Sequence, residues 1–282
     1  MEREPDFRLF WMLAAVCALA AATIALGGFD RYLFLEVNRR AASVFSEGVA
    51  SWLTILGHGL VAIMLLAPTM RRDPQVLTAA LFATPVAGFF SWAGKRIAME
   101  PRPAAVLDPA GFHIEGPTLL GHNSFPSGHS ITIFLLATVL ALGLPAVRDR
   151  PARWICLYAI ALFAAASRVM VGAHWPVDVF GGGALGIVAG ILGTWAVRRW
   201  PLWRGKYARL ALALIVLVCG GFLAFAETDY PLAQPLQWCA AGLGVYCALL
   251  LLVRFAARPP SPPPPPPPPL SRAARERGGE TT

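Results

Sequence analysis

The stretch NSFPSGHSITIFLLATVLALGL, from Asn123 to Leu144, changes from polar to apolar within a few residues. Its second part is close to the length that crosses a bilayer, because a helix rises about 1.5 Å per residue and the hydrocarbon core is about 30 Å thick. Its first part places Pro, Ser, Gly and His where the apolar run begins. The stretch therefore predicts a membrane helix whose polar start lies at one membrane surface.

Similar apolar runs recur along the whole chain. Of the 282 residues, 56% are hydrophobic and 14% are charged, which is too apolar for an ordinary soluble domain. We expect eight spanning helices, so the predicted fold class is an all-α, polytopic membrane helical bundle. They are expected at residues 9–28, 49–68, 76–94, 128–146, 153–171, 178–197, 209–226 and 236–254.

Basic side chains gather in alternate connections between these runs. The residues concerned are Arg71, Arg72, Arg148, Arg150, Arg153, Arg198, Arg199, Arg204, Lys206, Arg209, Arg254 and Arg258. The positive-inside rule places these connections and both termini in the cytoplasm. Because this arrangement accounts for most of the net charge of +8, no nucleic-acid partner is expected. The Arg-heavy, Ala-rich composition is typical of a GC-rich bacterial genome, which predicts the bacterial cytoplasmic (inner) membrane.

The two ends of the chain differ in character. The first apolar run is long and no clear cleavage site follows it, so we expect a retained helix rather than a signal peptide. The last residues read RPPSPPPPPPPPLSRAARERGGETT, and a proline run forms neither helix nor sheet. We expect a disordered basic tail at 259–282. A proline-recognising protein or anionic lipid headgroups are conceivable partners, but a plain spacer is the preferred interpretation.

Three polar patches interrupt the apolar pattern, and all three fall on the predicted outer face. They are KRIAMEPRP (Lys95–Pro103), FPSGHS (Phe125–Ser130) and SRVMVGAHWPVD (Ser167–Asp178). Each patch alone has a structural interpretation, such as an interfacial anchor for Lys95 or a helix cap for Ser127. Their convergence on one membrane surface favours a functional site.

The residue types in these patches favour the binding of phosphate. Backbone N–H groups at a helix start carry partial positive charge, and Gly128 lets an anion approach them closely. His174 and Asp178 are four residues apart, which places them on one helical face if the helix begins early enough. A carboxylate beside an imidazole fixes its tautomer and raises its basicity.

Together the patches resemble the three-block signature of the type 2 phosphatidic acid phosphatase superfamily, which is related to vanadium haloperoxidases and bacterial acid phosphatases. The matching positions are Lys95, Arg102 and Pro103, then Pro126, Ser127, Gly128 and His129, then Ser167, Arg168, His174 and Asp178. The resemblance covers mainly residues 95–180 and implies a six-helix phosphatase core at 1–200. An accessory pair of transmembrane helices at 201–258 departs from that core.

The resemblance implies a role for each residue. His174 would be the nucleophile that forms a phosphohistidine, and Asp178 would orient its ring. His129 would be the general acid, and then the base that activates water. The implied phosphate-binding residues are Lys95, Arg102, Ser127, Gly128 and Arg168.

No cofactor is expected. Three cations can neutralise a phosphate, and no cluster of carboxylates accompanies them to hold magnesium or zinc, so metal-independent turnover is predicted. The five cysteines have no CxxC spacing, which predicts neither a disulfide framework nor a zinc site. Other polar residues receive structural interpretations: His58 as a buried, hydrogen-bonded residue, and four loop residues as solvated, with the tuning of specificity as the alternative for these four. The loop residues are Asp108, His113, Glu115 and His122.

These features predict an integral-membrane lipid phosphatase, with its active site facing the periplasm, that hydrolyses a phosphomonoester or diphosphate. Undecaprenyl diphosphate, lipid A phosphate, phosphatidic acid and phosphatidylglycerophosphate are all open as substrates. A lipid phosphotransferase using the same histidine is one alternative. A non-catalytic lipid transporter is disfavoured because the spans are nearly free of charge. Gly182, Gly186 and Gly190 form a small-residue face that predicts close packing against a neighbouring helix or in a homo-oligomer.

Overall fold

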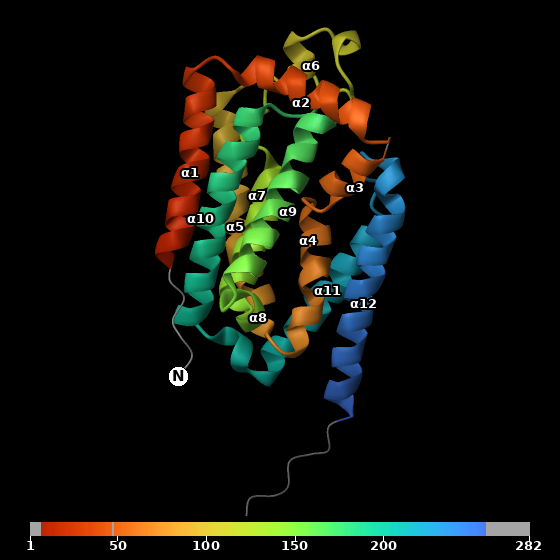
Figure 1. Cartoon of the computed structure of the whole chain (residues 1–282). Helices are drawn as coiled ribbons and strands as arrows, with labels where there is room; N and C mark the ends of the chain where they lie inside the picture. The colour runs from red at the N-terminus through yellow and green to blue at the C-terminus, as the bar shows by residue number, and fades with distance from the viewer. Residues whose placement is uncertain (1–6, 47, 258–282) are drawn as a thin grey trace, which may run out of the picture.

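The computed structural model describes residues 7–46 and 48–257. Within those ranges the regular structure is all helical, as predicted, and no strand occurs (Figure 1). The predicted tail at 259–282 lies outside the described residues. The α-helices are α1 (Phe7–Leu26), α2 (Asp30–Val44), α3 (Val49–Ile55), α4 (Gly59–Leu66), α5 (Pro74–Ala98), α6 (Pro103–Val106), α7 (Gly128–Gly143), α8 (Pro145–Arg148), α9 (Pro151–Met170), α10 (Pro176–Arg199), α11 (Lys206–Phe225) and α12 (Gln234–Ala256). The 3₁₀ helices are η1 (Ala67–Arg71), η2 (Pro109–Gly111), η3 (Leu202–Arg204) and η4 (Pro231–Ala233).

Six segments of the described chain are long and apolar enough to cross a membrane, and each overlaps a predicted span. They are α1, α5 with its continuation to Val106, α9, α10, α11, and α12 with the turn before it. The two remaining predicted spans are present in altered form. Helix α7 has 16 residues, which makes it about 24 Å long and shorter than a typical hydrocarbon core. The run predicted at 49–68 is not one straight helix, because α3 and α4 meet at an angle of 71°.

The break between α3 and α4 lies where the chain passes the start of α7. A Cβ atom on Gly57 would lie 2.8 Å from the carbonyl oxygen of His129, closer than real Cβ contacts allow. Glycine also has a low helix propensity, and a second glycine, Gly59, follows two residues later. The break therefore lets the α3–α4 segment approach the backbone of α7.

Helix α2 lies inside the predicted outer connection 29–48, which is too polar to be recognised as a span. It lies across one end of the bundle (Figure 1). Phe34, Asn38 and Ala41 form its buried face at helical spacing. The ring centroid of Phe34 is 5.1 Å from those of Phe112 and Trp175. Helix α2 therefore covers the end of the bundle at which the outer connections meet.

Helix α10 is the central helix and packs against α1, α5 and α7. A Cβ atom on Gly186 would lie 2.3 Å from the carbonyl oxygen of Ile131, and one on Gly190 would lie 2.6 Å from the Cβ of Thr138. The predicted small-residue face is therefore used inside the chain, against α7, and is not free for a second copy.

Helices α11 and α12 pack on each other and against α4 and η1. Cβ atoms on Gly220 and Gly244 would both meet the Sδ atom of Met64, at 3.3 and 2.1 Å. The described chain begins and ends at the same end of the bundle, opposite α2 and α6 (Figure 1). This arrangement agrees with an even number of crossings.

Candidate active site

The three sequence patches meet at the end of the bundle that α2 covers (Figure 1). The backbone N–H of Ser127 donates to the carbonyl oxygen of Asp178 at 3.1 Å, which joins the second patch to the third. The indole N–H of Trp175 donates to the carbonyl oxygen of Pro101 at 2.7 Å, which joins the third patch to the first. The ends of α5, α7, α9 and α10 therefore form one site.

A buried histidine–carboxylate pair lies at its centre. The Nδ1 atom of His174 is 3.1 Å from Oδ2 of Asp178, and both side chains are buried. Oδ2 also accepts hydrogen bonds from the hydroxyl of Ser124 at 2.5 Å and from the backbone N–H of Trp175 at 2.9 Å. The condition that would place both residues on one helical face is not met, because α10 begins at Pro176 and His174 lies before it. The pair forms instead because Asp178 folds back to cap that helix start.

The contacts of His174 select its chemical form. With Nδ1–H donating to Asp178, the lone pair lies on Nε2, which is 3.4 Å from Nη1 of Arg102. Burial lowers the pKa of His174 well below its usual value of 6.5, and the charges of Arg168, Arg102 and Lys95 lower this pKa further. The lowered pKa favours the neutral imidazole, in which the Nε2 lone pair faces Arg102.

Arg102 follows α5 and is held entirely by neutral acceptors. Its Nη1 donates to the carbonyl oxygen of Ala173 at 3.0 Å, and its Nε donates to Oδ1 of Asn123 at 2.9 Å. The residue is only 9% exposed. A buried guanidinium without a carboxylate partner in the described chain retains its charge for an incoming anion.

Arg168, in the last turn of α9, is held in the same way. Its Nη1 donates to the hydroxyl of Tyr230 at 2.8 Å and to that of Thr54 at 3.4 Å. Its Nε is buried and has no partner among the described residues. Lys95, in the last turn of α5, is half-buried and adds its charge to those of Arg102 and Arg168. Three cationic side chains therefore lie at the same end of the bundle, an arrangement whose chemistry suits an oxyanion.

The start of α7 provides the fourth side of the site. The Ser127 side chain accepts a hydrogen bond from the backbone N–H of Ser130 at 3.3 Å, as expected of a helix cap. A Cβ atom on Gly128 would meet only the hydroxyl of Ser91, at 3.6 Å. The helix start is therefore open on the Gly128 side, and His129 follows in the first turn.

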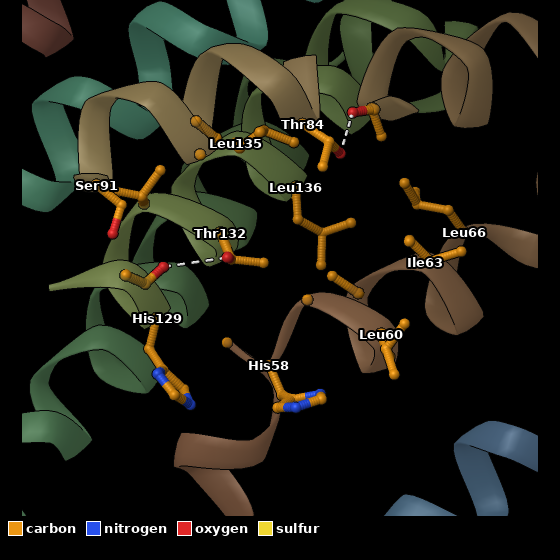
Figure 2. A pocket seen from close by; sticks show the side chains of 18 residues that line it. His58, Leu60, Ile63, Leu66, Thr84, Ser91, His129, Thr132, Leu135 and Leu136 are labelled. Carbon is orange, nitrogen blue, oxygen red and sulfur yellow. Dashed lines mark hydrogen bonds between the residues drawn. The ribbon is translucent and has the colours of Figure 1, made fainter. Parts of the chain in front are cut away.

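An apolar cavity of about 550 Å³ adjoins His129 between α4, α5 and α7. Figure 2 shows His129 and His58 at one side of it, with leucine and isoleucine side chains beyond them. The two imidazole rings are 6.5 Å apart. The labelled apolar residues that line the cavity are Leu60, Ile63, Leu66, Leu135 and Leu136. The cavity runs within the depth of the membrane-spanning helices.

Two structural interpretations need correction. The Nδ1 atom of His58 is buried without a partner among the described residues, so its ring is not fully hydrogen-bonded. Glu115 is not simply solvated: it accepts hydrogen bonds from the backbone N–H groups of Gly48 and Ser51 and from the Ser51 hydroxyl. Glu115 therefore ties the long outer connection to α3.

Several contacts of the site have no signal in the sequence. Ser124 and Asn123 lie beside the second patch, but the sequence does not show which residues they contact. The partner of Ser124 is His174, 50 residues later in the chain, and the partner of Asn123 is Arg102. Asn38 of α2 donates to the carbonyl oxygens of Val169 and Met170, at 3.1 and 3.0 Å. Tyr230 belongs to the connection between α11 and α12. Only the folded chain brings these residues to the site.

Comparisons with known proteins agree with this geometry. A sequence model of the PAP2 superfamily matches residues 76–202. A lipid A 1-phosphatase of Rhizobium etli is 31% identical over 247 residues, which are 81% of this chain and 94% of that protein. An undecaprenyl-diphosphatase of Sulfolobus acidocaldarius is 27% identical over 190 residues, 63% of this chain and 85% of that protein.

Two further similarities cover a smaller share of this chain. A lipid A 1-phosphatase of Porphyromonas gingivalis is 40% identical over 73 residues, 26% of this chain, and the match spans 16% of that protein. The crystal structure of LpxE from Aquifex aeolicus has a TM-score of 0.48 and 25% identity, and the match covers 58% of this chain and 94% of that one.

Proposed function

Because the chain belongs to the PAP2 superfamily, we propose that it hydrolyses a lipid phosphate through His174, without a metal ion. The chain is an integral-membrane phosphatase and hence a hydrolase. One observation carries the proposal. The buried His174 has Nδ1 3.1 Å from Asp178, and its Nε2 lone pair accepts a hydrogen bond of 3.4 Å from Arg102, a cation that an incoming phosphate would contact.

The reaction proceeds in two displacements. In the first, Nε2 of His174 forms a bond to phosphorus while the bond from phosphorus to the lipid oxygen breaks, and His129 donates a proton to that oxygen. In the second, His129 takes a proton from water as the water oxygen bonds to phosphorus. The N–P bond breaks, inorganic phosphate leaves, and His174 is neutral again. Asp178 stabilises the imidazolium form between the two steps.

Fixed positive charge replaces a metal ion in this mechanism. Arg102 and Arg168 neutralise the equatorial oxygens of the transition state, and Lys95 adds a third charge. Ser127 and the N–H of Gly128 contribute the start of α7 to the same cradle. Neutral carbonyl, amide and hydroxyl groups hold the two guanidinium groups, which supports their availability to the substrate.

The apolar cavity supports a lipid as substrate. It adjoins His129 and is walled mainly by apolar side chains of α4, α5 and α7. When the phosphate of a lipid lies beside His129, one of its alkyl chains would fill this cavity. That chain would then be buried in the protein instead of in the surrounding bilayer. A soluble phosphate ester would leave it empty.

We rank a phosphorylated glycolipid of the lipid A type first among substrates. The relative named for that activity matches 94% of its own length. Undecaprenyl diphosphate ranks second, because the relative named for it matches less of this chain. The basic residues of the opposite end, among them Arg71 and Arg148, support an active site facing the periplasm of a bacterial inner membrane, with both termini cytoplasmic.

The test is phosphate release by the purified protein in detergent with EDTA, measured on lipid A, undecaprenyl diphosphate and phosphatidic acid. His174→Ala and His129→Ala are expected to lose about 10³-fold or more of the rate. His122→Ala, which removes an exposed loop histidine, is the matched control and is expected to keep it. Parental release by His174→Ala, or release that depends on added metal, would refute the mechanism. Phosphate transfer to an added lipid alcohol, in place of release, would identify a phosphotransferase.

A further inference from the structure

Tyr230 reaches the active site from a part of the chain outside residues 76–202, the range that the PAP2 superfamily model matches. Its hydroxyl accepts a hydrogen bond from Nη1 of Arg168 at 2.8 Å. The guanidinium carbon of Arg168 also lies 5.5 Å from the centre of the Tyr230 ring, within the range of a cation–π interaction. Tyr230 is 4% exposed, so both contacts are shielded from solvent.

The turn that carries Tyr230 is fixed from within the accessory helices. Gln237 of α12 is fully buried. Its amide group donates to the carbonyl oxygens of Leu223 and Ala226, at 2.6 and 2.7 Å, where α11 ends. Its carbonyl oxygen accepts from the hydroxyl of Thr228 at 3.0 Å. The α11–α12 turn therefore has a defined conformation rather than that of a loose loop.

The same turn is fixed from outside by the core of the protein. The indole N–H of Trp52 in α3 donates to the carbonyl oxygen of Leu232 at 2.6 Å. Gly116 of the long outer connection has a φ of +88°, and a Cβ atom there would lie 2.8 Å from a ring carbon of Tyr230. The close contact with Gly116 therefore holds the phenol ring, whereas the Trp52 hydrogen bond ends at Leu232, two residues beyond it.

The chemistry of the pair suits phosphate binding. A carboxylate in place of Tyr230 would hold Arg168 equally well but would neutralise its charge and compete with the substrate. An uncharged hydroxyl fixes Nη1 and leaves the charge available, and the unpartnered Nε of Arg168 remains free to donate. The other acceptor of Nη1, Thr54, is farther away at 3.4 Å. Tyr230 is thus the principal anchor of this guanidinium.

We infer that Tyr230 is a positioning residue for phosphoryl transfer, and that the α11–α12 hairpin is thereby part of the catalytic machinery. The inference rests on the proposed function of Arg168 as a ligand of the transferred phosphate. It assigns a role to the two helices that lie beyond the six-helix core.

The test compares Tyr230→Phe with Trp52→Phe. The first removes the hydroxyl that holds Arg168 and keeps the ring and its packing. The second removes a hydrogen bond to the same turn that does not touch Arg168. We expect Tyr230→Phe to lower kcat/KM for the lipid phosphate about 10- to 100-fold, the range of a lost hydrogen bond to a charged group. Inhibition by vanadate, which adopts the geometry of the transition state, should weaken by a similar factor. Trp52→Phe should stay close to the parent in both measurements.

Two results would overturn the inference. One is a Tyr230→Phe variant with parental kcat/KM and parental vanadate inhibition. The other is an equal loss in Trp52→Phe, which would mean that the turn acts only through general stability; unfolding midpoints are measured on both variants to check this. Failure of the proposed function is distinguished in the same series, because the parent and His174→Ala would then release phosphate equally.

Discussion

One added methyl group at Gly186 tests whether the contact between α10 and α7 sets the distance between the proposed nucleophile and the proposed general acid. His174 and Asp178 lie at the start of α10, and His129 lies at the start of α7. In Gly186→Ala the new Cβ atom would lie 2.3 Å from the carbonyl oxygen of Ile131, whereas ordinary contact begins at 3.4 Å. Since that neighbour is backbone, the two helices must separate by about 1 Å.

The size of the effect follows from that displacement. A misplacement of about 1 Å at reacting groups costs about 10²-fold in rate. Overpacking costs about 1–3 kcal/mol of stability, and only part of this is offset by the gain of about 0.5–1 kcal/mol that alanine brings to a helix. We therefore expect Gly186→Ala to lower kcat about 100-fold and to lower the unfolding midpoint.

A second glycine of the bundle provides the matched control. Gly221, in α11, has nothing within 4 Å of its Cβ position. Gly221→Ala should keep the parental kcat and be slightly more stable. Phosphate release at saturating lipid and thermal unfolding in the same detergent measure both quantities. Parental kcat in Gly186→Ala, or an unfolding midpoint as high as that of Gly221→Ala, would contradict the claim that this contact sets the active-site geometry.

Two further predictions concern the nucleophile. Asp178→Asn should lower kcat about 10³- to 10⁴-fold, because the amide no longer selects the Nδ1–H tautomer of His174. Ser124→Ala should lower kcat only about tenfold, because it removes one hydrogen bond to the same carboxylate oxygen. Circular dichroism would check that both variants fold, and a Ser124→Ala rate as low as that of Asp178→Asn would refute this ranking. Because burial and the nearby cations hold the pKa of His174 well below 6.5, the acidic limb of the kcat/KM profile assigned to this group should also lie well below pH 6.5. Replacing Arg168 with Gln removes a cation that disfavours protonation, so any residual activity should show that limb at higher pH; a limb that moves to lower pH would contradict the assignment.

The sequence predicts those features that depend on local composition and fixed spacing. Six of the eight predicted apolar runs correspond to described segments that are long enough to cross a membrane, because a bilayer imposes a minimum length on each. The patches around Lys95, Gly128 and His174 fall on one face because each lies at the same end of a crossing segment. The spacing of Gly182, Gly186 and Gly190 predicts close helix packing, and the structure identifies the partner as α7.

Features that depend on tertiary contacts escape this reasoning. Helix α2 is recognisable only once Phe34 and Asn38 have partners to bury against, since its hydropathy is that of a loop. The break at Gly57 becomes necessary only because the start of α7 passes within contact distance. In the sequence Tyr230 looks like an ordinary interfacial tyrosine. Only the structure shows that its hydroxyl accepts a hydrogen bond from Arg168, which lies far earlier in the chain.

The arrangement of charge explains why the active-site end of the bundle contains so many buried polar groups. Asp178 is the buried carboxylate at the centre of the site, and its Oδ2 is occupied by His174, Ser124 and the backbone of Trp175. Asp178 therefore pairs with His174, and no hydrogen bond joins it to Arg102 or Arg168 among the described residues. Those guanidinium groups repel each other and are held by oxygens of neutral groups. In the proposed mechanism an anion offsets the repulsion between these cations, and a phosphate that develops charge during transfer does so most fully in the transition state.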